Sequence, residues 1–258
     1  MHAQTRASLF LAAALFGAAC GGAAVDTTTD GKAPGSAPDN GTPGGGGCAL
    51  STSTAATATV TNSCAMLKRD TSACQAARAA KGLAGVWLKF SCRVTLTSAS
   101  GMITATSDGQ PDYKSFYFAT SNACYEAWPQ GIHNPNSIAA QSYSVNFPTA
   151  PNTTATSMGG NGLIGLALNG VPLYANFAAP GDDIYREAVS FDKCAGHPQM
   201  TGSYHYHSEP YSLTYNDANL VGVLRDGYAL YGRKDMDGST PTLDAYGGHS
   251  AVTADSGG

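Results

Sequence analysis

The sequence predicts a mainly β, disulfide-containing domain with two pseudo-repeated halves and a short N-terminal helix. Runs of β-branched and aromatic residues alternate with glycine- and proline-containing turns, and one of these runs recurs 57 residues later. Charged residues make up 12% of the 258 positions, with 14 Lys and Arg against 18 Asp and Glu. Such sparse and slightly acidic charge argues against a nucleic-acid-binding protein, which would present a basic face.

The first 20 residues have the pattern of a bacterial export signal. Arg6 precedes an apolar run from Leu9 to Ala19 that is too short to span a bilayer but has the length of a signal core. Small residues then lead into Cys20, as in a lipobox, which predicts that Cys20 is lipidated. We therefore expect an exported protein, a periplasmic or cell-surface lipoprotein that contacts the membrane only through its lipid anchor. Ordinary cleavage followed by plain secretion is the alternative.

Residues 21–47 are predicted to form a flexible linker, because glycine and proline dominate and large apolar side chains are missing from Asp26 onward. The folded body is expected to span residues 48–258. Within it, Cys64–Lys81 is the one stretch whose composition favours a helix. The segments VWLKFSCRVTLTS from Val86, MITATS and SYSVNF are predicted as strands.

Two pairs of segments indicate an internal repeat. Leu163–Ala175 aligns with Leu220–Gly232, with five of thirteen positions identical, and each copy reads as strand, Asn/Asp-Gly turn, strand. Phe191–His197 likewise matches Leu243–His249. Because the chain ends where the counterpart of Tyr204–His207 would begin, we expect a truncated C-terminus. A diverged second half is the alternative.

Seven cysteines are present, and none forms a CxxC pair, so a zinc ribbon or thioredoxin-type site is not indicated. Apart from Cys20, the remaining six can form up to three disulfides in an oxidising compartment. Their pairing is not predicted by the sequence, since six cysteines allow about 15 connectivities.

Three histidines within eleven residues are the candidate metal ligands: His197, His205 and His207. On a strand, His205 and His207 share one face while Tyr204 and Tyr206 share the other, because side chains alternate. The preceding loop is long enough to bring His197 to the pair. Three nitrogen ligands suit zinc or copper better than calcium or magnesium.

The predicted fourth position can be filled by water, Asp192, Glu209 or His249. Asp192, Tyr204, Tyr206 and Glu209 are expected to surround the site even where they do not bind the ion. The alternative interpretation is a pair of half-buried histidines in a hydrogen-bond network with tyrosines.

Several of these segments together resemble the YHYH domain family of exported proteins. The likeness rests on FDKCAGHP (191–198), GSYHYH (202–207) and DGYALYG (226–232), with NPNSI (134–138) and Gln141. The family's role is not established, so the resemblance implies the domain and not its chemistry. Relatives often carry histidine where this chain has Tyr113, and commonly a second GH…YHYH pattern near the C-terminus.

The leading functional hypothesis is therefore binding of zinc or copper through His197, His205 and His207, with His249 as a possible contributor. A metal-activated water would permit hydrolysis, but no residue pattern identifies a substrate, so the sequence leaves enzymatic activity open. The competing hypothesis is a surface module that binds a glycan or a partner protein through tyrosine-rich loops.

Overall fold

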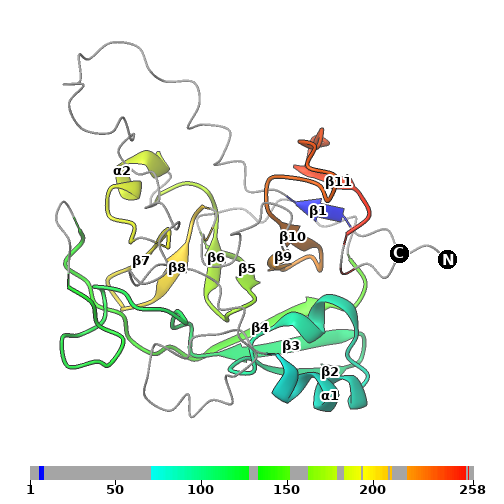
Figure 1. Cartoon of the computed structure of the whole chain (residues 1–258), viewed down its shortest axis with the longest axis horizontal. Helices are drawn as coiled ribbons and strands as arrows, with labels where there is room; N and C mark the ends of the chain where they lie inside the picture. Colours follow the sequence, from blue (N-terminus) through cyan, green and yellow to red (C-terminus); the bar gives the residue numbers. More distant parts are fainter. Residues whose placement is uncertain are drawn as a thin grey trace.

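The computed structural model describes residues 6–8, 71–127, 133–151, 162–178, 183–192, 194–208, 210, 220–253 and 255. Over these residues the chain is mainly β, as predicted, with one three-stranded sheet, one eight-stranded sheet and short helices (Figure 1). No helix in the described part of the chain is long and apolar enough to cross a membrane.

The smaller sheet is antiparallel and consists of β2 (Thr95–Ala99), β3 (Met102–Ser107) and β4 (Tyr143–Pro148), in that order. The strands predicted for MITATS and SYSVNF are confirmed. Along β3 and β4 the burial alternates, so that Ile103, Ala105, Val145 and Phe147 point into the core. This alternation is what a sheet with one solvated face requires.

Helix α1 (Ser72–Ala80) confirms the second part of the helix predicted for residues 64–81, whose first seven residues lie outside the described ranges. The strand predicted to begin at Val86 is wrong over its first part. Gly85–Lys89 instead form the 3₁₀ helix η3, and the strand β2 starts only at Thr95. Gly85 has a φ of 58°, a conformation that favours glycine and breaks an extended run. The resulting turn buries Trp87 against Phe90 and Phe147.

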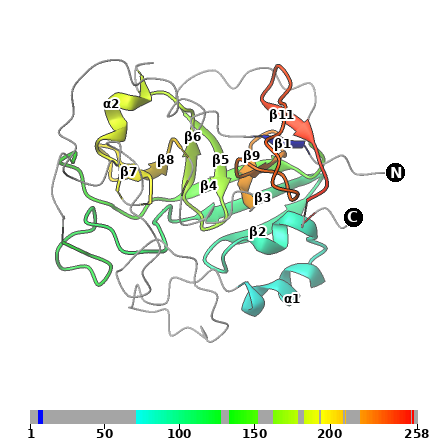
Figure 2. The same ribbon diagram turned by 45° about the horizontal axis from the view of Figure 1, so that its top comes forward.

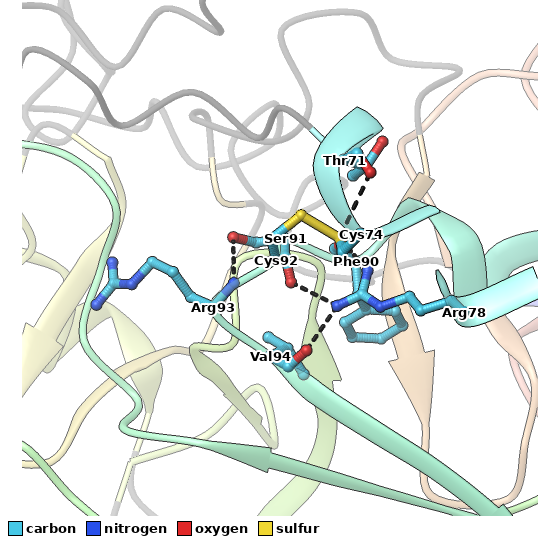
Figure 3. The surroundings of a disulfide bond; sticks show 8 residues. All are labelled: Thr71, Cys74, Arg78, Phe90, Ser91, Cys92, Arg93 and Val94. Atoms are coloured by element: carbon cyan, nitrogen blue, oxygen red, sulfur yellow. Dashed lines mark hydrogen bonds between the residues drawn. A yellow bond between two sulfur atoms is a disulfide. The ribbon is translucent and has the colours of Figure 1, made fainter. Parts of the chain in front are cut away.

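A disulfide between Cys74 and Cys92 joins α1 to the loop before β2 (Figure 3). Beside it, the buried guanidinium of Arg78 donates hydrogen bonds to the carbonyl oxygens of Phe90, Ser91 and Val94. One side chain therefore supplies donors to three backbone acceptors of the irregular loop, of which the Ser91 carbonyl oxygen also accepts from Val94 N–H. Cys124 and Cys194 are also disulfide-bonded, which agrees with the prediction of up to three disulfides.

The larger sheet has the strand order β11-β1-β10-β9-β5-β6-β8-β7. Both predicted hairpins are present, and they pair with each other antiparallel through β5 and β9. Gly170 and Gly227 occupy equivalent turn positions with φ values of 90° and 91°. The strands, in chain order after the smaller sheet, are β5 (Leu163–Ala167), β6 (Pro172–Tyr174), β7 (Gly196–Pro198), β8 (Tyr204–Tyr206), β9 (Leu220–Leu224), β10 (Ala229–Tyr231) and β11 (Gly248–Ser250).

The segments that match in sequence before His197 and before His249 also share their backbone hydrogen bonds. Asp192 N–H donates to the Gly196 carbonyl oxygen, and the Asp192 carboxylate accepts from Gly196 N–H. Asp244 and Gly248 make the same two bonds. Each loop therefore delivers its histidine onto a strand in the same way.

Arg6–Ser8, inside the predicted export signal, form the strand β1, which pairs parallel with β10 and antiparallel with β11. The predicted lipidation site Cys20, the linker 21–47 and Glu209 lie outside the described residues. Export, lipidation and the linker therefore stay predictions.

We expect Arg78→Leu to lower the free energy of unfolding by about 2 kcal/mol or more, because it removes the guanidinium donor from the Phe90 and Val94 carbonyl oxygens at about 1–3 kcal/mol each. Urea unfolding followed by circular dichroism measures this change. The matched control is Arg93→Leu, which removes a half-exposed ion pair with Asp108 and should cost about 1 kcal/mol or less. Equal losses in the two variants would contradict the assigned role of Arg78.

Candidate metal centre

The three candidate histidines meet because β7 and β8 pair in antiparallel register. His197 on β7 lies directly opposite His205 on β8. His207 follows one residue after the end of β8, on the same side as His205 because side chains alternate along an extended chain. All three side chains are buried, with 3–5% of their surface exposed.

One ligand atom from each of these histidines lies within 4.8 Å of the other two. The Nε2 atoms of His205 and His207 are 2.9 Å apart. The ring centroids of His197 and His205 are 4.7 Å apart. Among the described residues, this is the group of histidine, cysteine and carboxylate side chains that could hold a metal ion.

The Nδ1 atom of each histidine already has a protein partner. His205 Nδ1 lies 3.0 Å from the Ser203 carbonyl oxygen, and His207 Nδ1 contacts the carbonyl oxygen of Ala175. A carbonyl oxygen only accepts, so both Nδ1 atoms carry the proton. Each ring in its neutral form then presents an unprotonated Nε2.

His197 reaches the same state through a serine. Its Nδ1 lies 2.8 Å from Ser190 Oγ, while the Ser190 hydroxyl donates its own proton to the Glu187 carbonyl oxygen at 2.7 Å. Ser190 therefore accepts from His197 Nδ1–H, and the Nε2 lone pair of His197 is free of a proton. That Nε2 is buried and has no hydrogen-bond partner.

Burial keeps these rings neutral. It lowers the pKa of His197 to about 2, with a further contribution from the positive charge that His205 and His207 would carry. It lowers the pKa of His205 to about 3, assisted by His207, and lowers the pKa of His207 as well. Three neutral imidazoles with converging Nε2 lone pairs form an electron-rich centre that a cation would stabilise.

The opposite face of β8 holds a separate network of hydroxyl groups. The Tyr113 hydroxyl lies 2.7 Å from that of Tyr204 and 2.9 Å from that of Tyr206, and all three tyrosines are buried. Tyr204 also packs its hydroxyl over Gly196, where an added Cβ would lie 2.3 Å from the hydroxyl oxygen. The residue before His197 must therefore be glycine for this packing to exist.

Asp192 belongs to the tyrosine network, so its prediction as a fourth ligand is wrong. Its carboxylate accepts hydrogen bonds from Ser115 Oγ at 2.6 Å and the Tyr204 hydroxyl at 2.7 Å. Its pKa is raised to about 6, because burial outweighs these hydrogen bonds. Asp192 supports the site from behind β8, as part of its predicted surroundings.

Tyr113 also lies in this network and not among the imidazoles. A tyrosine at this position therefore removes no ligand from the three-histidine group.

His249 is not brought to the other histidines, so its prediction as a metal ligand of this group is wrong. It lies on β11, at the far end of the sheet from β7 and β8 in both views (Figures 1 and 2). Its Nε2 lies 2.7 Å from Asp235 Oδ1. The shared loop geometry before His197 and His249 thus leads to two different environments.

Glu187 is a site residue that the sequence analysis missed. It lies on α2 (Ile184–Ala188), which sits beside β7 and β8 (Figure 1). Its Oε2 is 3.5 Å from the Nε2 atoms of both His197 and His207. Glu187 precedes His197 by ten residues on a separate helix, and no motif spacing connects them. The one available signal was that Glu187 is a carboxylate close in sequence to the histidine motif.

A pocket of about 450 Å³ opens onto the three histidines and Glu187. Its wall includes Asn134 and Asn136, whose side-chain amides both donate to the Pro198 carbonyl oxygen at 2.9 and 3.3 Å. These two bonds hold the end of β7 immediately after His197. The NPN segment noted in the sequence therefore positions a site strand.

Comparison with known families gives one match: the family described as YHYH protein matches residues 142–255. Residues 142–255 therefore form a YHYH domain. No curated protein and no solved structure shows a significant match to it.

The YHYH match contains the whole three-histidine group, Glu187 and both hairpins. Helix α1, η3 and the strands β2 and β3 precede it, as does the NPN segment that contacts β7. The YHYH motif itself supplies both halves of the arrangement, with tyrosines for one network and histidines for the other.

Acidification should destabilise the metal-free protein. Unfolded histidines bind protons near pH 6.5, whereas folded His197 and His205 stay neutral to about pH 2 and 3, so unfolding takes up two protons between pH 6 and 4. Asp192 reduces this proton uptake by about one, because its folded pKa of about 6 exceeds its unfolded value and unfolding therefore releases its proton. His207, whose pKa is also lowered, adds to the uptake, so the net is about one proton or more. The unfolding free energy should therefore fall by about 1.4 kcal/mol or more for each pH unit of acidification.

Urea titrations of the metal-free chain at pH 6, 5 and 4 measure this slope. His205→Gln removes the contribution of one histidine, so the slope should become shallower by about 1.4 kcal/mol per pH unit over the same range. An unchanged slope in that variant would show that His205 is not held neutral by the fold.

Proposed function

We propose that this YHYH protein binds one transition-metal ion between the Nε2 atoms of His197, His205 and His207. The observation that supports the proposal is the hydrogen bonding of all three Nδ1 atoms to protein oxygens. Second partners of this kind fix the tautomer and orientation of histidines that ligate metals.

The residues present fit such an ion. Metal–nitrogen bonds of about 2.0–2.1 Å place two tetrahedral ligand atoms about 3.3 Å apart. The 2.9 Å between the Nε2 atoms of His205 and His207 is within a few tenths of an ångström of that distance. Imidazole ligands suit zinc and copper, the two ions expected from the sequence.

The pocket gives the site a side open to small molecules, which is typical of metal centres that bind substrates or other ligands. A metal in such a position acts as a Lewis acid when bound. The chain's own contribution would be to hold the ring nitrogens in place and to keep the site dry on the β8 side. No side chain identifies a substrate, so the proposal is one of metal binding.

We further propose that the protein acts outside the cytoplasm as a lipoprotein anchored through Cys20. The Cys74–Cys92 disulfide supports an oxidising compartment. The low content of charged residues supports a function without nucleic acid.

The competing function is a surface module that binds a glycan or a partner protein. Tyr246, which is 89% exposed in the loop before β11, is the observation in its favour. Six other tyrosines are buried: Tyr113, Tyr117, Tyr204, Tyr206, Tyr228 and Tyr231. The tyrosine-rich surface is therefore less extensive than the sequence suggested.

Isothermal titration of the full chain with zinc and with copper(II) should show one site with a dissociation constant below 1 µM. The double variant His205→Gln, His207→Gln should lose at least about 100-fold in affinity, because it removes two of three nitrogen ligands. Elemental analysis of the purified protein should show the same loss of bound metal.

His249→Gln is the matched control and should bind as the wild type does, since His249 contacts Asp235 far from the site. Near-UV circular dichroism checks that the double variant is folded. Wild-type protein that binds neither ion below micromolar concentrations, yet binds polysaccharide or peptidoglycan, would favour the competing function.

Ser190→Ala should weaken metal binding by about 10- to 100-fold, the usual cost of losing an outer partner of a metal-ligating histidine. The serine hydroxyl orients His197 and also connects it to the backbone of α2. Competition with a chelating dye measures the change. Ser190→Thr, which keeps the hydroxyl, should retain most of the affinity, and equal losses in both variants would contradict this role.

A further inference from the structure

We infer that Glu187 is a fourth protein ligand of the metal, through Oε2, so that the centre is a three-histidine, one-carboxylate site for a divalent ion. This inference rests on the proposed metal-binding function and adds a ligand that lies outside the histidine motif. Three independent features of the site support it.

The first feature is distance. Glu187 Oε2 lies 3.5 Å from His197 Nε2 and 3.5 Å from His207 Nε2. Ligand atoms at the corners of a tetrahedron with bonds of about 2.0–2.2 Å are about 3.3–3.5 Å apart. The carboxylate oxygen therefore already occupies a corner relative to two of the three nitrogens.

The second feature is the proton count. The Nδ1–H groups of His197 and His207 are used by Ser190 Oγ and the Ala175 carbonyl oxygen. A neutral ring has no second proton, so neither Nε2 can donate to Glu187. Two nitrogen lone pairs and a carboxylate oxygen then face one another, an arrangement that is repulsive until a cation lies between them.

The third feature is a mechanical link between the carboxylate and one imidazole. Ser190 Oγ accepts from His197 and donates to the backbone carbonyl oxygen of Glu187 itself. Asp183 caps the start of the same helix by accepting from Tyr185 N–H at 3.0 Å. Glu187 and His197 are thus held as one hydrogen-bonded unit, which pre-organises both ligands.

The proposed ligands, three imidazole nitrogens and one carboxylate oxygen, also restrict which metal ions the site would prefer. Three neutral imidazoles leave the full double charge of a divalent ion in a largely buried site, and one carboxylate offsets half of it. A carboxylate oxygen is a harder ligand than sulfur or imidazole, so the set favours zinc(II), cobalt(II), nickel(II) or iron(II) over copper(I). The Glu187 side chain is 31% exposed, so it lies at the pocket side of the ion.

The test uses cobalt(II) chloride and the metal-free full chain, because the visible spectrum of cobalt(II) reports its ligands. In Glu187→Gln, which keeps the shape and removes the charge, cobalt should still bind but at least about tenfold more weakly, with a shifted visible band. Glu187→Asp, whose shorter side chain reaches the ion less well, should bind cobalt with an affinity between those of the wild type and Glu187→Gln. Asp237→Asn, the same charge change in the exposed turn before Ser239, should match the wild type.

The possible results separate this inference from the proposed function. Wild-type affinity and an unchanged spectrum in Glu187→Gln would overturn the inference and leave the three-histidine site standing. Loss of affinity with an unchanged spectrum would also overturn it, because Glu187 would then act only through charge. A wild-type chain that binds no cobalt would overturn both.

Discussion

The alternation of side chains along β8 is the constraint on which the rest of the site depends. In Tyr204–His207 the pleat sends two hydroxyl groups to one side of the chain and two imidazoles to the other. A strand shifted by one residue would exchange these two sets. Because β7 pairs with β8 in the register that opposes His197 to His205, the third imidazole arrives on the same side.

The two faces of β8 have different chemistry. Behind the strand, Asp192 accepts hydrogen bonds from Ser115 and Tyr204, so each buried polar group there has its partner. In front of it, the Nε2 atom of His197 has no hydrogen-bond partner, and the Nε2 atoms of His205 and His207 lie 2.9 Å apart. Glu187 Oε2 lies 3.5 Å from the Nε2 atoms of His197 and His207. One network is complete within the protein, whereas the other leaves the buried Nε2 atom of His197 without a hydrogen-bond partner.

Two loops of the same local geometry place their histidines in different chemical environments. The loops before His197 and His249 use the same aspartate-to-glycine hydrogen bonds and deliver a histidine onto a strand in the same way. His197 then meets two more imidazoles, whereas His249 meets Asp235. The difference comes from the strand that lies next to each loop, and in the first half that strand is β8.

The sequence by itself determined the strands β3 and β4, both hairpins and the two faces of β8, because strand periodicity and Asn/Asp-Gly turns are local signals. It failed at Gly85–Lys89, where burial of Trp87 against distant rings outweighs local β propensity. It could not assign Asp192 to the tyrosines, separate His249 from the group or find Glu187. Only the tertiary structure decided those points, since packing α2 beside β7 and placing β11 at the opposite end of the sheet are long-range events that no spacing along the chain records.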